Sequence, residues 1–180
     1  MTAHQNAEDK NIIFIGFMGA GKTTVGKLLA EKLHRQFIDT DELIEEEFKM
    51  PPSQIFKVYG EKVFREKEKS LITSLNEEKN LVLSLGGGAF LQEEIRAVCL
   101  SKATVILLDI SFDCWKERLD LIIDSRPVLH GKTIEEMEQL YNNRREIYSN
   151  HHIKISTDYK IPEQIADEIL EKVQFNEENN

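Results

Sequence analysis

Five short apolar runs recur along the chain, and longer segments with a helical repeat of apolar positions lie between them. The segment 22–34 places Val25, Leu29 and Leu33 on one face, and residues 61–76 repeat this spacing. Strands that alternate with helices predict a mostly parallel sheet covered on both faces, the three-layer α/β class. The runs that we predict as strands are residues 12–16, 37–39, 81–85, 103–109 and 152–156.

The first predicted strand leads directly into a glycine-rich turn before the first predicted helix. Gly16, Gly21, Lys22 and Thr23 satisfy the pattern GxxxxGK[ST] in the strand-loop-helix context that the pattern requires. Glycines let the backbone approach a phosphate closely, and the N–H groups at a helix start attract negative charge. A purely geometric role for the glycines leaves the Lys-Thr pair unexplained. The sequence therefore predicts a phosphate loop, with ATP contacts from Gly19, Ala20, Gly21, Lys22, Thr23 and Thr24.

Two aspartates follow the second predicted strand. Ligands of parallel sheets bind beyond the carboxyl ends of the strands, so this position favours a functional role. If the chain stays extended, Asp39 and Asp41 point in different directions. One of them can then organise Mg²⁺ while the other faces a substrate hydroxyl. The alternative is an Asp or Thr cap on the following helix, which accounts for only one of the two aspartates.

The helix predicted over 61–76 carries an arginine near its start, and the third strand ends in three glycines. Arg65 alone is typical of a surface partner for Glu61 or Glu68 at helical spacing. The glycines, residues 86–88, leave room for the backbone to contact a ligand, although a flexible turn is the alternative.

The fourth predicted strand ends in Asp109. An apolar strand that ends in aspartate holds Mg²⁺ in many nucleotide-hydrolysing proteins. Asp39 already offers a carboxylate on the metal side, and Asp109 can equally prepare the next helix, expected over 112–120. We therefore do not assign the metal to Asp109.

Three arginines lie further along the chain. Arg126 stands next to a proline between two helical segments, which suits a lid that brings a cation to a transferring phosphoryl group. An exposed arginine on a turn is the alternative. Arg144 and Arg145 end a helix, where cations favour the helix dipole and need no ligand.

Composition restricts the class of protein. The chain has 180 residues and a net charge of −9, which argues against general binding of nucleic acid or anionic membranes. Cys99 and Cys114 are too few for a disulfide framework and are expected to be buried, reduced thiols. No apolar stretch approaches the ~20 residues of a membrane span, and the N-terminus lacks a signal peptide's apolar middle. A cytoplasmic, monomeric protein is expected, with one domain over 11–174 between disordered residues 1–10 and a frayed tail, 175–180.

Taken in order, the segments GFMGAGKTT, FIDTDELIE, GEKVFREKE, SLGGGAF, RPVL and RREIY resemble shikimate kinase over about residues 11–174. The resemblance is closest to the enzymes of Bacillus-like bacteria. It implies the fold of nucleoside monophosphate kinases, a five-stranded parallel sheet with a helical substrate-binding region and a lid at about residues 121–132. It also implies Mg²⁺- and ATP-dependent phosphorylation of the shikimate 3-hydroxyl, in the pathway to chorismate and the aromatic amino acids.

The resemblance also assigns residues. The shikimate contacts fall on Asp41, Arg65 and Arg144, together with the glycine run of Gly86, Gly87 and Gly88. The Mg²⁺ position falls on Asp39 beside Thr23, and the lid arginine on Arg126. The loop 156–162, which ends in Pro162, corresponds to the segment beside adenine.

Two departures from the family pattern affect this assignment. The family often has proline two positions before Tyr148, where this chain has Glu146, so Arg144 is preferred over Arg145 only by its spacing of four. The arginine that commonly stacks on adenine is replaced by Leu119, and Arg118 is the nearest candidate.

These assignments predict a division of labour. Asp41 orients the attacking hydroxyl and accepts its proton, while Lys22, Mg²⁺ and Arg126 stabilise charge on the transferred group. A different acceptor, such as gluconate, a nucleoside monophosphate or an antibiotic hydroxyl, is the enzymatic alternative. A non-catalytic domain that binds nucleotide or shikimate is the other alternative.

Overall fold

The computed structural model describes residues 10–125 and 127–178 and contains a five-stranded parallel sheet. The strand order is β2-β3-β1-β4-β5. The strands are β1 (Ile12–Ile15), β2 (Gln36–Asp39), β3 (Leu81–Ser84), β4 (Thr104–Asp109) and β5 (Ile153–Ser156). The predicted α/β class and all five predicted strands are confirmed, with ends that differ by one residue.

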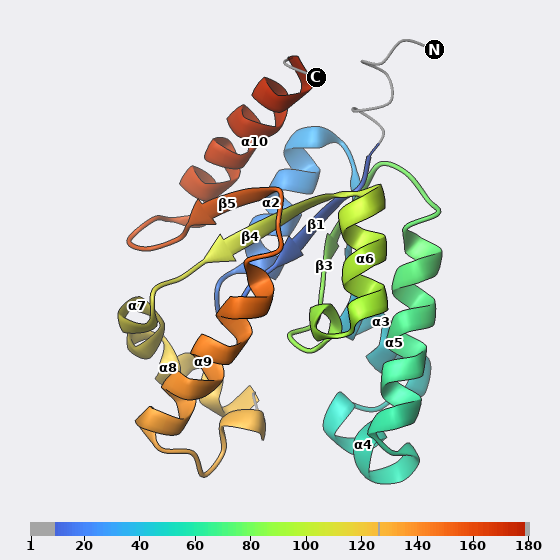
Figure 1. The fold of residues 1–180 in the computed structure, drawn as a ribbon, viewed down its shortest axis with the longest axis vertical. Helices are drawn as coiled ribbons and strands as arrows, with labels where there is room; N and C mark the ends of the chain where they lie inside the picture. The colour runs from blue at the N-terminus through green and yellow to red at the C-terminus, as the bar shows by residue number, and fades with distance from the viewer. Residues whose placement is uncertain (1–9, 126, 179–180) are drawn as a thin grey trace.

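Helices cover both faces of the sheet (Figure 1). Helices α2 (Lys22–Leu33) and α10 (Pro162–Glu178) pack together on one face. Helices α5 (Glu61–Leu75) and α6 (Glu93–Lys102) lie on the other. The three central strands, β1, β3 and β4, are therefore almost fully buried, which explains their continuous apolar sequences.

The connection from β2 to β3 forms a helical region below the sheet (Figure 1). It contains α3 (Thr40–Phe48), α4 (Pro52–Tyr59) and the start of α5. Ile44, Ile55 and Phe64 form its own small core, which contains one fully buried side chain from each helix. The sequence pattern did not single out α4, although its start at Pro52 follows the preference for proline in a first helical turn.

The connection from β4 to β5 differs from the prediction. In place of one helix over 112–120, the chain forms α7 (Phe112–Glu117) and α8 (Leu119–Ile122), with a break at Arg118. Two 3₁₀ turns, Ile123–Ser125 and Pro127–Leu129, then lead to α9 (Ile134–Tyr148). A capping box at Thr133 and Glu136 begins α9. Another 3₁₀ turn, Ala89–Leu91, follows the glycines after β3.

Both cysteines are buried, as predicted. Burial raises the pKa of Cys99 to about 12, so this thiol stays protonated at neutral pH. Among the helices that the structure describes, none combines the length and apolar character needed to cross a membrane.

One buried polar side chain ties the amino end of the sheet together. The Asn11 amide donates to Leu75 O and to Glu78 O, both at 3.0 Å, and its Oδ1 accepts from Leu81 N at 2.9 Å. Asn11 thus joins the start of β1 to the end of α5 and the start of β3. Only 3% of the residue is exposed, so water cannot easily replace these bonds.

We expect Asn11→Ala to lower the free energy of unfolding by about 2 to 3 kcal/mol, because it leaves the Leu81 N–H and the carbonyls of Leu75 and Glu78 without their hydrogen-bond partner. Urea unfolding monitored by circular dichroism measures this loss. Ser101→Ala is the control, since the Ser101 hydroxyl donates only to Val98 O at an exposed helix end. Its cost should stay below about 0.5 kcal/mol. Equal, small losses in the two variants would contradict the bridging role.

Candidate active site

The predicted phosphate loop connects the buried strand β1 to helix α2. Gly19 and Gly21 have left-handed backbone, with φ of 79° and 100°, which residues with side chains rarely adopt. A Cβ on Gly16 would lie 2.5 Å from Leu108 O on β4. Two features of the loop thus require glycine: the left-handed turn at Gly19 and Gly21, and the close approach of β4 to Gly16. Phe17 and Met18 are buried and pack the loop against the core.

The ammonium group of Lys22 lies at the start of this loop. It donates to Gly16 O at 2.7 Å and to Phe17 O at 3.3 Å. The next residues, Thr23 and Thr24, form the first turn of α2, and the Thr24 side chain faces solvent. The loop thus combines a cation with a helix start, the two groups that a polyphosphate requires.

Thr23 and Asp39 are brought together from different elements. The Thr23 hydroxyl donates to Asp39 Oδ2 at 2.9 Å, while Asp39 Oδ1 caps α3 by accepting from Asp41 N and Glu42 N. A hydroxyl and a carboxylate side by side are hard oxygen ligands that fit Mg²⁺. Among the described residues, no group of three or more His, Cys, Asp or Glu side chains could hold a metal ion. Oxygens of this pair therefore suit a metal whose remaining ligands come from water and phosphate.

For the two aspartates the structure shows the alternative of an Asp cap, and the two carboxylates still face different partners. Helix α3 begins at Thr40, because the Asp39 cap turns the chain immediately after β2. Asp41 lies in the first helical turn, and its carboxylate faces the glycines after β3, where a Cβ on Gly86 would collide with Asp41 Oδ1. The Thr40 hydroxyl fixes this approach, since it donates to Ser84 O at 3.2 Å and accepts from Gly86 N at 3.3 Å.

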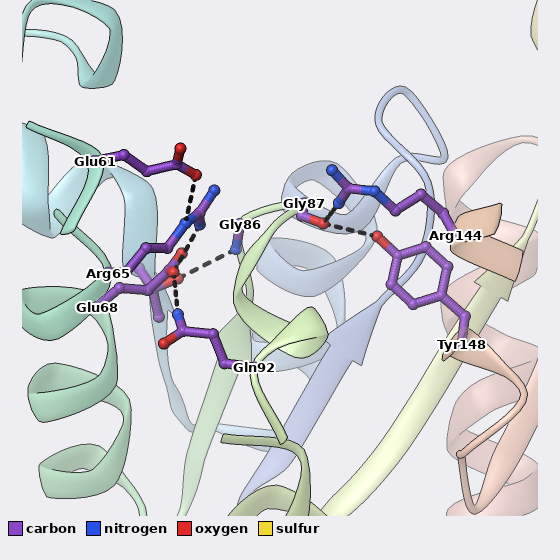
Figure 2. Close-up of polar contacts among 9 residues, drawn as sticks. Glu61, Arg65, Glu68, Gly86, Gly87, Gln92, Arg144 and Tyr148 are labelled. Carbon is purple, nitrogen blue, oxygen red and sulfur yellow. Dashed lines mark hydrogen bonds and ion pairs between the residues drawn. The ribbon is translucent and has the colours of Figure 1, made fainter. Parts of the chain in front are cut away.

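Arg65 forms both of the ion pairs that its spacing predicted, yet it is not a surface residue. Its guanidinium contacts Glu68 Oε2 at 2.8 Å and Glu61 Oε1 at 3.3 Å, and 28% of its side chain is exposed (Figure 2). A Cβ on Gly88 would lie 2.5 Å from Arg65 Nη1. The Arg65 side chain is therefore held against the glycine turn, residues 86–88.

Glu68 lies beneath Arg65 and is almost completely buried. Its Oε2 also accepts from Gln92 Nε2 at 2.7 Å (Figure 2). Burial raises the pKa of Glu68, and the hydrogen bond from Arg65 offsets only part of this rise. Burial alone would lower the pKa of Arg65, but hydrogen bonds to Glu68 and Glu61 outweigh it and raise the pKa. Sequence reasoning identified Glu68 only as a surface partner; its spacing of three from Arg65 was the available signal.

Helix α9 places a second arginine on the other side of the glycine turn. Arg144 Nη1 donates to Gly87 O, and the Tyr148 hydroxyl donates to the same oxygen at 3.0 Å (Figure 2). Burial raises the pKa of Tyr148, which keeps this phenol neutral and able to donate. Arg145 points elsewhere, with its Nη2 3.9 Å from Asp109 Oδ2. The structure therefore brings Arg144, rather than Arg145, to the glycine turn.

Asp109 does not join Thr23 and Asp39. Its carboxylate is 2.9 Å from Lys154 Nζ on β5 and faces Arg145, at the other side of the sheet's carboxyl edge. The backbone carbonyl of Asp109 accepts from Thr157 N at 2.9 Å. Asp109 therefore pairs with Lys154 on β5, apart from the Thr23–Asp39 pair.

Helix α7 and Arg118, which directly follows it, support the phosphate loop from the side. Arg118 Nη1 donates to Gly19 O at 3.0 Å, and Trp115 Nε1 donates to Met18 O at 2.9 Å. Arg118 was predicted from the resemblance as an adenine contact, whereas Trp115 was not singled out. The sequence features that could have indicated Trp115 were that it is the single tryptophan of the chain and that it precedes Arg118 by three residues.

Two other predicted nucleotide contacts lie further along the chain. Pro162 begins α10, and Arg126 lies outside the described residues.

This geometry defines a class of protein. A strand, a glycine-rich loop carrying Lys and Thr, and a helix, in a parallel sheet with β3 between β1 and β2, are the fold and phosphate loop of a P-loop kinase. A family model described as shikimate kinase matches residues 18–174. The chain therefore belongs to the shikimate kinase family.

Individual relatives agree with this membership. A shikimate kinase of Oceanobacillus iheyensis is 52% identical over 93% of this chain and 91% of its own length. A shikimate kinase of Bacillus subtilis is 50% identical over 93% of this chain and 90% of its own length. The structure of shikimate kinase from Acinetobacter baumannii in complex with shikimate superposes with a TM-score of 0.86 at 32% identity, covering 97% of this chain and 98% of that one.

Substitutions of Asp39 can separate the effect of its helix cap on stability from the effect of its negative charge. Asp39→Ala removes the cap on α3 and should lower the free energy of unfolding by about 1 kcal/mol. An asparagine side chain keeps an acceptor for the helix start, so Asp39→Asn should remain within about 0.5 kcal/mol of the wild type. Chemical denaturation of the three proteins measures the difference. If the alanine and asparagine variants lose the same stability, the cap does not account for the effect of Asp39.

Proposed function

We propose that this site transfers the terminal phosphoryl group of ATP to the 3-hydroxyl of shikimate, giving shikimate 3-phosphate and ADP on the route to chorismate. Membership of the shikimate kinase family gives the reaction. The observation that carries the substrate assignment is the position of Arg65 and Arg144 on opposite sides of the glycine turn (Figure 2). The Asp41 carboxylate lies beside the same turn, next to Gly86. Two cations and a carboxylate acceptor are complementary to a small acid that carries hydroxyls.

On the acceptor side, the arginines bind the substrate carboxylate and Asp41 binds ring hydroxyls. Arg65 is prepared for this role because Glu68 and Glu61 already hold its guanidinium, so little side-chain entropy is lost on binding. Asp41 orients the attacking hydroxyl and accepts its proton. Residues 86–88 supply backbone contacts at Gly86, Gly87 and Gly88.

On the nucleotide side, residues Gly19 to Thr24 surround the phosphates, and Lys22 stabilises charge on the transferred group. Thr23 and Asp39 would hold Mg²⁺, which, when bound with ATP, neutralises phosphate charge. Arg118 and Pro162 lie beside the adenine. Arg126 acts from the lid, about residues 121–132; its place beside Pro127 between two helical segments and the family resemblance support this role.

Other properties follow from charge and topology. The net charge of −9 makes local arginines necessary for two anionic substrates and disfavours nucleic acid as a partner. We propose that residues 11–174 form one domain that works as a monomer in the cytoplasm. Shikimate and ATP are its small-molecule partners.

A coupled ADP-release assay with Mg²⁺ and ATP, with and without shikimate, tests the reaction. Gluconate, AMP and an aminoglycoside serve as alternative acceptors, and ³¹P NMR identifies the phosphorylated product. We expect ADP release to depend on shikimate and to yield shikimate 3-phosphate. Release that depends on another acceptor, or nucleotide binding without turnover, would replace this function by one of the alternatives.

We expect Arg65→Ala to raise the KM for shikimate about 10- to 100-fold, because it removes a charge-assisted contact to the substrate carboxylate. The KM for ATP should change little. Steady-state kinetics measures both constants. Lys62→Ala removes a cation from the same helix, but its side chain is 88% exposed and pairs only loosely with Glu66, so its kinetics should match the wild type. Unchanged shikimate affinity in a folded Arg65→Ala variant would refute the assignment.

A further inference from the structure

The lone tryptophan of the chain makes a contact that the proposed chemistry does not use. Trp115 is fully buried, and its indole Nε1 donates to Met18 O, inside the phosphate loop, at 2.9 Å. The same nitrogen lies 3.8 Å from the position that a Cβ on Gly19 would occupy. A side chain of α7 thus supports the loop at the Met18–Gly19 peptide.

Aromatic packing fixes the orientation of this indole. Trp115 stacks on Phe112, with ring centroids 5.5 Å apart and planes 18° from parallel. It meets Phe17, in the loop, edge to face at 5.3 Å. Tyr141 on α9 contacts both Phe17 and Phe112, at 5.3 and 5.4 Å. The indole therefore has little freedom to rotate, and its N–H has a defined direction.

Because a peptide bond is planar, this hydrogen bond also determines the direction of the next N–H in the loop. In a trans peptide the carbonyl and the following N–H point in opposite directions. Because Met18 O points toward Trp115, the N–H of Gly19 points away from α7. Phosphate loops bind anions through backbone N–H groups that point outward together, and they lose affinity if a peptide plane flips. Gly19, with its left-handed backbone, has no side chain to resist such a flip.

We propose that Trp115 is a positioning residue for nucleotide binding: its indole N–H holds the Met18–Gly19 peptide with the Gly19 N–H directed toward the phosphates of ATP. The inference rests on the ATP site described under Proposed function. It assigns to Trp115 an effect on nucleotide affinity and none on shikimate affinity, because its indole N–H donates to the phosphate loop and not to the glycine turn, residues 86–88.

The test uses Trp115→Phe, which keeps an aromatic ring but removes the N–H donor. Isothermal titration calorimetry with ADP and Mg²⁺ should give a Kd about fivefold higher than the wild type, the change expected for one hydrogen bond. The KM for ATP should rise by a similar factor, while the KM for shikimate stays within about twofold. Tyr141→Phe is the matched control: it removes a buried hydroxyl that donates to Ile110 O at 2.6 Å in the same aromatic cluster, but not to the loop.

A second variant separates the hydrogen bond from packing. Because the chain has a single tryptophan, β-(3-benzothienyl)alanine can replace it throughout; this analogue has the indole shape with sulfur in place of N–H. We expect it to reproduce the loss of ADP affinity with thermal stability close to the wild type.

The outcomes are distinct. ADP affinity equal to the wild type in the analogue would overturn the proposal, as would a Tyr141→Phe variant that loses ADP affinity as much as Trp115→Phe. Wild-type protein that binds neither ADP nor ATP would instead overturn the proposed function.

Discussion

The active site depends on one constraint, the absence of side chains in the turn that follows β3. Asp41 on α3 and Arg65 on α5 occupy the space where side chains of Gly86 and Gly88 would stand. Gly87 offers its carbonyl to Arg144 and Tyr148 on α9. Three helices from distant parts of the chain thus take their position from a few backbone atoms. The turn itself is fixed by β3, whose pairing with both β1 and β2 holds it at the centre of the carboxyl edge.

The electrostatics of the site are local. In a chain with an excess of acidic residues, three cations in the described part of the site are held by specific neighbours: Lys22 by loop carbonyls, Arg65 by Glu68 and Glu61, and Arg144 by Gly87 O. Burial of Glu68 beneath Arg65 costs free energy, which the ion pair and the Gln92 amide offset only in part. The buried Arg65–Glu68 ion pair therefore fixes the position of the guanidinium more than it stabilises the fold. The free-energy cost of burying Glu68 is consistent with a functional role for Arg65.

The sequence predicted much of this structure because its strongest signals are local. Continuous apolar runs located the buried strands, and the glycine-lysine-threonine pattern located the phosphate loop, since both depend on residues adjacent in the chain. The end of the second strand at Asp39 was predicted, but the pattern left open whether the chain stays extended or Asp39 caps the next helix; the structure shows the cap, and α3 begins at Thr40. The sequence could not decide which arginine of α9 faces the glycine turn, because this depends on how the helix is rotated about its axis. The hydrogen bond from Tyr148 to Gly87 O fixes that rotation. Trp115 acts on a loop almost a hundred residues away, a contact without a signal in any local window.

The bare backbone of the glycine turn has a consequence for inhibitors. Resistance commonly arises when a substitution enlarges or reshapes a residue that a drug touches. A side chain added at Gly86 or Gly88 would displace the Asp41 carboxylate or the Arg65 guanidinium, the groups to which we assign substrate binding. On the proposed function, a compound anchored to the peptide groups of this turn would therefore leave few resistance mutations there, since a substitution that excluded it would also displace a substrate-binding side chain.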